Sequence, residues 1–247
     1  MNITIIGYGR MGKEVEQIAE KRGHTIVSTV DPVQGLFSEL SDEAVKDTQG
    51  VIEFGLPEGI LDRISFLSSR NIPVVIGTTG WQEQEAKAEE IVKSTGGALL
   101  YGSNFSPGAN LFFRIVEEAA GLINSLDDYD IMMHEYHHKK KKDSPSGTAL
   151  TLAGKILENL ERKKSICFDP LQREIRDDEL HIGTVRGGHI PGIHRVTMDS
   201  PADSIVLEHS ARNRSGFASG SVIGLEWLME KRGMHHADSF FRDLMES

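Results

Sequence analysis

The sequence predicts an α/β protein with two domains: a doubly wound parallel sheet, followed by an α+β domain with a mixed sheet. Three observations lead to this prediction. Short β-branched runs alternate with helical apolar patterns through about the first hundred residues. A glycine-rich turn follows the first of these runs. After about Asn110, strand patterns follow one another without long helices between them, which is typical of antiparallel or mixed sheets.

The strands expected in the first half are short and stop at turn residues. They cover residues 3–6, 25–30, 51–54, 74–76 and 98–101. Apolar residues at helical spacing predict helices near residues 11–19, 60–67 and 82–93. Strands that alternate with helices imply a parallel sheet covered on both faces, and ligands bind such sheets at the carboxyl ends of the strands.

The second half changes character near the turn signal at Pro107-Gly108. Helices are expected at residues 111–123 and 147–160, and strands at 129–133, 182–185, 193–198 and 204–207. Two later helices, at residues 216–231 and about 236–245, are expected to pack back on the first domain. The predicted division is therefore residues 1–108 with 216–247, and residues 109–215.

The turn after the first strand has the spacing G-x-G-x-x-G, from Gly7 to Gly12. Gly7 permits the tight turn, Gly9 lets the backbone approach a pyrophosphate, and Gly12 lets helix pack on strand. The helix start adds free N–H groups and a positive dipole for the phosphates. Asp31 ends the second strand, where an acid accepts hydrogen bonds from the adenosine ribose. This context indicates a Rossmann dinucleotide-binding domain rather than a purely structural glycine turn.

Composition and apolar patterning disfavour several classes of function. The formal net charge of −10 disfavours partners such as nucleic acid or an anionic membrane. No apolar run reaches the roughly 18 residues that a membrane span needs, and the N-terminus resembles a strand more than a signal peptide. The one cysteine, Cys167, excludes an intrachain disulfide and is consistent with a reducing cytoplasm. We expect a soluble cytoplasmic protein.

Residues 135–149 concentrate unusual chemistry. His137 and His138 can move protons near neutral pH, and the lysines that follow can hold carboxylates. The loop at Pro145 then leads into a helix N-terminus, which is a natural anion site. A dicarboxylate substrate beside a proton donor suits this segment.

The same segment, EYHHKKKKDSPSGTA, resembles the signature E-x-H-H-x-x-K-x-D-A-P-S-G-T-A of the 4-hydroxy-tetrahydrodipicolinate reductase family. It departs at Ser144, where alanine is usual, and we expect this small change to be tolerated. Other motifs follow in the family's order, at residues 7–12, 77–80, 103–106 and 209–220, so the resemblance covers nearly the whole chain. It implies reduction of 4-hydroxy-tetrahydrodipicolinate to tetrahydrodipicolinate, with loss of water, in lysine and diaminopimelate biosynthesis.

The resemblance also implies roles at the matching positions. His137 would be the proton donor, and Lys141 would act in proton donation and substrate binding. His138, with Gly147 and Thr148 at the helix start, would contact the substrate. The positions that would line the cofactor are Gly7, Tyr8, Gly9, Arg10, Met11, Gly12, Asp31, Gly77, Thr78, Thr79, Ser103, Asn104, Phe105 and Ser106. The domain of residues 109–215 would bind substrate and build a homotetramer.

The residue after Asp31 bears on the choice of cofactor. Family members often carry a basic residue there, which can meet the 2′-phosphate of NADPH, whereas this chain has Pro32. Asp31 would accept the ribose hydroxyls of NADH and repel a phosphate, although Arg10 and Lys13 could neutralise one. We predict that NADH is preferred and NADPH accepted.

Other interpretations of these residues remain. His137 and His138 could bind a metal, but neighbours in a strand face opposite ways, so no metal is expected. The run Lys139–Lys142 could bind nucleic acid, but a solvated loop is the plainer interpretation in an acidic chain. Two rival classes are a different Rossmann oxidoreductase and a regulator that senses NAD(H) without turnover; the complete proton-donor segment counts against both.

Overall fold

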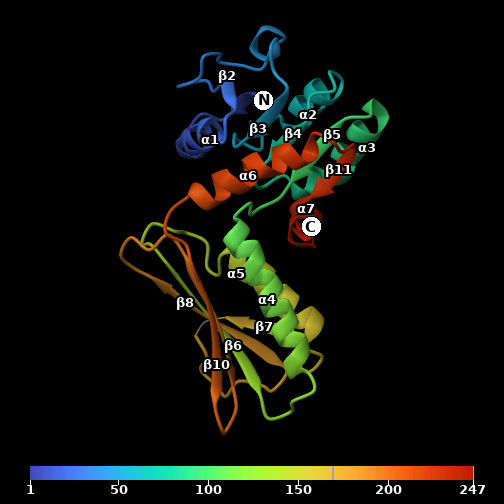
Figure 1. Ribbon diagram of the computed structural model, residues 1–247. Helices are drawn as coiled ribbons and strands as arrows, with labels where there is room; N and C mark the ends of the chain where they lie inside the picture. The colour runs from blue at the N-terminus through green and yellow to red at the C-terminus, as the bar shows by residue number, and fades with distance from the viewer. Residues whose placement is uncertain (169, 247) are drawn as a thin grey trace. The chain divides into compact units, whose positions relative to one another are not determined.

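A computed structural model describes residues 1–168 and 170–246, and the chain divides into two compact units (Figure 1). The first unit comprises Met1–Pro107 and Arg214–Ser247, and the second comprises Gly108–Asn213. The boundaries expected from the sequence differ from these by one or two residues. Within the described residues, every helix is too short or too polar to cross a lipid bilayer.

The first unit is built on a six-stranded sheet in the order β11-β5-β4-β3-β1-β2, and every neighbouring pair is parallel. Its strands are β1 (Asn2–Ile6), β2 (Thr25–Val30), β3 (Gly50–Glu53), β4 (Val74–Ile76), β5 (Ala98–Tyr101) and β11 (Gly233–His236). Neighbouring residues such as Leu99 and Leu100 are both fully buried. Their side chains point to opposite faces, so both faces of the sheet must be covered.

Two groups of helices provide that cover. Helices α1 (Arg10–Lys21), α6 (Ser215–Leu228) and α7 (Ala237–Glu246) share one core with Ile5 and Leu100. Helices α2 (Ile60–Ser68) and α3 (Glu85–Thr95), with the short 3-10 helix η1 (Glu43–Val45), share the other with Val51 and Leu99. A second 3-10 helix, η2 (Gln82–Gln84), precedes α3. The doubly wound parallel sheet predicted from the sequence is confirmed.

Two details of this unit differ from the expectation. Strand β11 was not expected, because its four residues, GMHH, contain no β-branched side chain. It pairs along β5 and so completes the edge of the sheet. The connection from β2 to β3, residues 31–49, is described throughout and contains η1 but no α-helix, so the alternation of strand and helix is broken there.

The second unit has a five-stranded mixed sheet in the order β10-β9-β6-β8-β7. Its elements are α4 (Pro107–Ile123), β6 (Asp130–His137), α5 (Gly147–Asn159), β7 (Ser165–Phe168), β8 (Glu179–Arg186), β9 (Ile193–Asp199) and β10 (Ser204–Ser210). Strand β6 is antiparallel to β9 and parallel to β8, which confirms the mixed sheet. Helices α4 and α5 pack in one core with β6, β8 and β9, so both cover the same face (Figure 1).

Strand β6 is longer than the sequence suggested, because it continues from residue 133 to His137. Every second residue of β6 is buried, from Ile131 through Met133 and Glu135 to His137. The buried positions of β6 are apolar up to Met133. After Met133 the strand continues, but its buried positions carry ionisable side chains. This extension places two ionisable side chains on the buried face of the sheet.

Candidate active site

The glycine-rich turn lies at the carboxyl edge of the parallel sheet. Ile6 at the end of β1 pairs with Glu53 of β3, which pairs with Ile76 of β4, which in turn pairs with Tyr101 of β5. The turns at residues 7–12, 77–80 and 102–106 therefore leave the same edge. The structure brings together the three segments that the sequence singled out for a dinucleotide.

The three glycines of the first turn have different surroundings. Gly7 has a φ of +82°, and a Cβ there would lie 2.5 Å from the backbone N of Gly55. A Cβ on Gly12 would lie 2.5 Å from the carbonyl oxygen of Gly7. A Cβ on Gly9 would meet nothing within 4 Å, and Gly9 provides no side-chain cap to α1. The turn is therefore tightly packed at Gly7 and Gly12 but leaves room at Gly9. It lies at a helix start, where backbone amides are available to an anion.

Asp31 is held by the backbone on both carboxylate oxygens. Its Oδ2 accepts from the amide of Tyr8 at 3.0 Å, and its Oδ1 accepts from the amides of Val33 at 2.9 Å and Gln34 at 3.0 Å. These bonds, led by that from Val33, lower the pKa of Asp31 despite partial burial, and Lys13 adds to the effect. Asp31 is therefore a fixed negative charge beside the glycine turn.

The remaining positions predicted for the cofactor differ in accessibility. Thr79, Ser103 and Arg10 are exposed. Thr78 is buried and donates to the carbonyl of Gly55, and the Asn104 side chain accepts from the amide of Ser106. Phe105 is only 1% exposed and packs in the core with α6 and α7, so only its backbone can face a ligand. Gly77 has no room for a side chain, because a Cβ would lie 2.1 Å from the ring of Phe54. Met11 and the Tyr8 side chain are partly buried, and the Tyr8 hydroxyl donates to Glu16.

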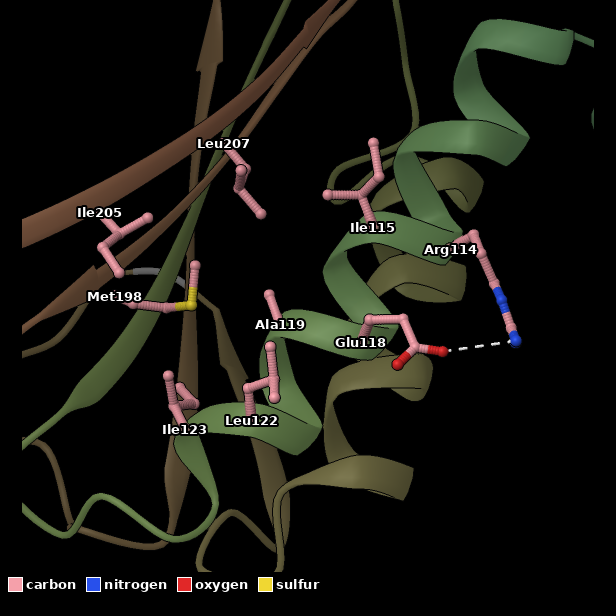
Figure 2. Close-up of a pocket in the computed structure, with 9 residues that line it drawn as sticks. All are labelled: Arg114, Ile115, Glu118, Ala119, Leu122, Ile123, Met198, Ile205 and Leu207. Carbon is pink, nitrogen blue, oxygen red and sulfur yellow. Dashed lines mark ion pairs between the residues drawn. The ribbon is translucent and has the colours of Figure 1, made fainter.

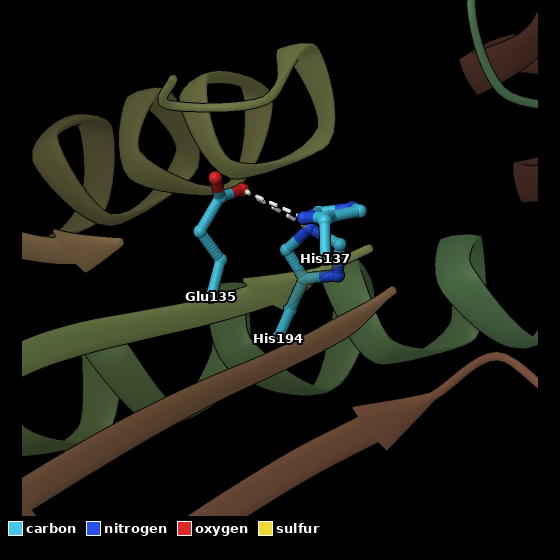
Figure 3. Close-up of side chains that lie close together, drawn as sticks. All are labelled: Glu135, His137 and His194. Atoms are coloured by element: carbon cyan, nitrogen blue, oxygen red, sulfur yellow. Dashed lines mark ion pairs between the residues drawn. The ribbon is translucent and has the colours of Figure 1, made fainter. Parts of the chain in front are cut away.

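The proton-donor segment builds a separate buried cluster in the second unit. Glu135 and His137 lie two residues apart on β6 and so share its buried face. In the antiparallel pairing with β9, Glu135 lies opposite His194, which is also buried. In the parallel pairing with β8, His137 lies opposite Arg186. Figure 3 shows the carboxylate of Glu135 pointing at the two imidazoles.

Glu135 is surrounded by hydrogen-bond donors. The amide of Ser146 lies 3.1 Å from each of its oxygens, and the Ser146 hydroxyl donates to Oε2. Arg186 donates to Oε1 at 2.6 Å. Burial would raise the pKa of Glu135, but these bonds outweigh burial and the net pKa is lowered. Glu135 is therefore a buried carboxylate that stays ionised.

The two buried histidines favour their neutral forms. Burial lowers the pKa of His137, which Glu135 partly opposes, while Lys141 and Arg186 lower it further. Burial and the neighbouring His137 lower the pKa of His194 to about 4. Among the described residues, Nδ1 of His137 has no hydrogen-bond partner and lies 3.6 Å from Oε2 of Glu135. A bound dicarboxylate would favour the charged form of His137.

The other predicted substrate contacts lie around this cluster. Lys141 pairs with Asp143, with Nζ 2.9 Å from Oδ2. His138 follows the end of β6, and its amide donates to the carbonyl of Ile190 at 2.8 Å. Gly147 and Thr148 form the start of α5, and a Cβ on Gly147 would meet nothing within 4 Å. The geometry thus offers a lysine and the start of a helix near a buried histidine.

Glu135, His137 and His194 also have the donor types of a metal site, since their ligand atoms lie within 4.8 Å of one another. Both oxygens of Glu135, however, already accept hydrogen bonds from Ser146 or Arg186. The positive charges of Arg186 and Lys141 act on the same cluster. A second cation would have to displace this arrangement, so the cluster is better suited to proton transfer than to metal binding.

The sequence alone does not point to His194, and it assigns neither Arg186 nor Ser146 a contact in the site. His194 could have been found, because it alternates with Val196 and Met198 along β9 and so shares their buried face. Arg186 lies at the end of β8, and only the strand register shows that it meets Glu135. Ser146 caps α5 by accepting from the amide of Ala149 at 3.1 Å, as a serine before a helix is expected to do.

Comparison with known proteins bears on the identity of this site. The family model for the N-terminus of dihydrodipicolinate reductase matches residues 1–105, and that for its C-terminus matches residues 108–240. The chain belongs to the dihydrodipicolinate reductase family. The family predicted from residues 135–149 is confirmed, as is the prediction of an NAD(P)H-dependent oxidoreductase.

Individual relatives support the assignment over the whole chain. A 4-hydroxy-tetrahydrodipicolinate reductase of Christiangramia forsetii is 39% identical over 100% of both chains. One from Rickettsia bellii is 33% identical over 99% of this chain and 96% of its own. The structure of a dipicolinate-bound dihydrodipicolinate reductase from Paenisporosarcina sp. TG-14 matches with a TM-score of 0.78 at 22% identity, covering 96% of this chain and 97% of that one. This last likeness establishes the shared fold.

Proposed function

We propose that the chain reduces 4-hydroxy-tetrahydrodipicolinate to tetrahydrodipicolinate, with loss of water, at the expense of NADH or NADPH. This is a step of lysine and diaminopimelate biosynthesis. The supporting comparison is the full-length match to reductases of that name. The structural observation that carries the proposal is His137, buried beside a fixed carboxylate and near Lys141 and the start of α5.

The proposed roles follow from the positions of these groups. A bound nicotinamide would supply the hydride, and the turn at residues 7–12 would hold its pyrophosphate. His137 would deliver the proton, since an acid near the reacting ring lowers the barrier. Lys141, with the backbone and hydroxyl at Gly147 and Thr148, would hold the carboxylates, and His138 would be a further contact. Their contribution is mainly orientation of the ring.

The direct test follows NADH oxidation by the purified chain with and without the product of the preceding synthase. Substrate-dependent oxidation is expected. Binding of NADH without any oxidation would instead support a nucleotide-sensing regulator, and oxidation with other small acids alone would support a different reductase.

The cytoplasmic location proposed for the protein is consistent with a pathway that uses these soluble metabolites.

Planar pyridine-2,6-dicarboxylate is expected to compete with the substrate. It carries two carboxylates that Lys141 and the start of α5 can hold, and charge-assisted bonds of this kind are the strong ones. Calorimetry with cofactor present should detect binding, and Lys141→Ala should weaken it about tenfold or more, since a hydrogen bond to a charged group contributes about 1.5–3 kcal/mol. Lys164→Ala, a lysine of the same unit away from residues 135–149, is the matched control. Failure of the wild-type chain to bind would contradict the proposed substrate class.

NADH is expected to be used about tenfold more efficiently than NADPH, a difference of roughly 1.4 kcal/mol. Three backbone amides hold the Asp31 carboxylate in place, so it cannot easily turn away from a 2′-phosphate. Lys13, whose Nζ lies 2.5 Å from Oε1 of Gln34, is close enough to lower the pKa of Asp31 and can offset part of the repulsion. Values of kcat/KM for both cofactors at fixed salt test this.

Two substitutions sharpen the cofactor test. Asp31→Asn should reduce the preference for NADH over NADPH, because it removes the negative charge that repels the 2′-phosphate of NADPH. Lys13→Ala should lower kcat/KM with NADPH while leaving that with NADH nearly unchanged. A clear NADPH preference in the wild-type chain would contradict the role given to Asp31.

We also propose a homotetramer built through the sheet of the second unit. Strand β10 lies at the edge of this sheet and exposes Ile205 and Val206 at 45% and 49%. Beside it, apolar side chains of α4, β9 and β10 line a groove of about 410 Å³ (Figure 2). An uncovered apolar edge of this kind is a common site of self-association. Light scattering is expected to give the mass of four chains, and Ile205→Glu to lower it; a monomeric wild-type chain would contradict the proposal.

A further inference from the structure

The two oxygens of Glu135 have different surroundings. Oε1 accepts from Arg186 at 2.6 Å. Oε2 lies 3.6 Å from Nδ1 of His137 and 3.7 Å from Nε2 of His194 (Figure 3). The Ser146 amide lies near both oxygens, but only Oε1 accepts from the guanidinium, and only Oε2 accepts from the Ser146 hydroxyl and lies near the two imidazoles.

His194 already has a nearer partner than Oε2. Its Nε2 lies 3.2 Å from the hydroxyl oxygen of Ser146, which also accepts from the amide of Ala149. His137 has no such alternative, because its buried Nδ1 lacks a hydrogen-bond partner among the described residues. A small rotation of the His137 ring would bring Nδ1–H within hydrogen-bond range of Oε2.

The other nitrogen of His137 faces a glycine. A Cβ on residue 192 would lie 3.0 Å from Nε2 of His137, which is closer than real Cβ contacts usually are. A side chain at residue 192 would therefore crowd Nε2, while Nδ1 points toward the carboxylate. The ring thus has Nδ1 beside the carboxylate and Nε2 beside a position where only glycine avoids crowding it.

We propose that Glu135 is a positioning residue for the proton donor. Its Oε2 accepts a hydrogen bond from Nδ1–H of His137, and this bond holds the ring so that Nε2–H faces the substrate. This inference rests on the proposed role of His137. In the transfer, the Nε2–H bond breaks, its electron pair stays on Nε2, and the proton goes to the reduced substrate. Nδ1 keeps its hydrogen throughout, and a proton from water restores Nε2–H.

Among the charges around His137, Glu135 is the main one that stabilises the protonated ring. The titratable or charged groups that face it are Glu135, His194, Arg186, Lys141 and Asp143. Burial, Lys141 and Arg186 lower the pKa of His137, and Glu135 raises it more strongly than Asp143 does. Removing the charge of Glu135 would take away the nearest negative charge from the protonated His137 ring and so disfavour that form.

The test is Glu135→Gln in the full chain, with the titration of His137 followed by NMR of ¹⁵N-labelled histidine. An opposite charge at this distance shifts a pKa by about 1–3 units, so the pKa of His137 is expected to fall by about one unit or more. In the pH profile of kcat, the limb that requires protonated His137 should move to lower pH by the same amount. Glu135→Asp, which keeps the charge, should restore most of the wild-type titration.

Glu179→Gln is the matched control, because it removes another buried carboxylate of the same sheet, one that pairs with Arg173 at 2.7 Å. It should leave the titration of His137 unchanged. A purely structural role for Glu135 would lower kcat equally at every pH with no movement of the His137 titration, and that result would overturn the proposal.

A measurement on the wild-type chain keeps the proposal testable if Glu135→Gln does not fold. The ¹⁵N shifts of neutral His137 should report the tautomer with hydrogen on Nδ1. The Nε2–H tautomer would overturn the proposal. This readout is independent of catalysis, so failure of the proposed function would show itself separately, as a lack of substrate-dependent NADH oxidation by the wild-type chain.

Discussion

His137→Gln is expected to lower kcat by about a hundredfold or more, because loss of a positioned general acid typically costs that much. Glutamine preserves the size of the side chain and some of its hydrogen bonding but cannot deliver a proton. The buried site leaves little room for water to replace it, since His137 is only 6% exposed. Steady-state kinetics with saturating substrate and NADH measure the effect.

The control is His134→Gln on the same strand. His134 lies three residues before His137, on the opposite and less buried face of β6, so its substitution should leave kcat close to that of the wild-type chain. The affinity for NADH should be unchanged in both variants, because the turns that would hold the dinucleotide belong to the other unit. Wild-type turnover in His137→Gln would exclude the proposed acid.

Gly7→Ala is expected to destabilise the first unit by about 3 kcal/mol or more and so to abolish dinucleotide binding. A left-handed φ costs a side chain about 1–2 kcal/mol, and overpacking adds about 1–3 kcal/mol. Both apply here, because Gly7 has a φ of +82° and the new Cβ would lie 2.5 Å from the backbone of Phe54 and Gly55. Urea unfolding and NADH fluorescence titration measure the two effects.

Gly9→Ala separates folding from binding in the same turn. Gly9 has a φ of −80°, and a Cβ there meets nothing within 4 Å, so the cost to folding should be about 1 kcal/mol or less. The methyl group would nevertheless stand where a pyrophosphate approaches the helix start, and NADH affinity should fall. Unaltered NADH affinity in a folded Gly9→Ala chain would place the cofactor elsewhere.

The parallel sheet was predictable because each of its first five strands is a short run rich in β-branched or apolar residues and is followed by a turn residue. Strand β11 escaped prediction, since its sequence has no intrinsic strand preference and it pairs only because β5 offers an open edge. The longer β6 was missed for a related reason: Glu135 and His137 continue the alternation with polar side chains. Tertiary pairing, rather than local propensity, decides both cases.

The candidate site was predictable to the extent that it lies in one continuous segment. Residues 135–149 carry a recognisable spacing, so His137, Lys141 and the helix start could be named from the sequence. Arg186 and His194 come from two other strands, and only the register of the sheet brings them to Glu135. Charge pairs between strands leave no mark in the spacing of a single segment.

The first unit is assembled from two stretches of chain that the second unit separates. A ribosome must therefore finish all of residues 108–213 before it makes α6 and α7, which cover one face of the parallel sheet. Until then, Ile5 and Leu100 lack the helices that will cover them in the folded unit. The second unit, in contrast, is continuous in sequence and can fold as it emerges. The nascent chain thus carries an exposed apolar sheet for the time needed to translate an entire domain, which makes this interval the one in which a chaperone is most useful.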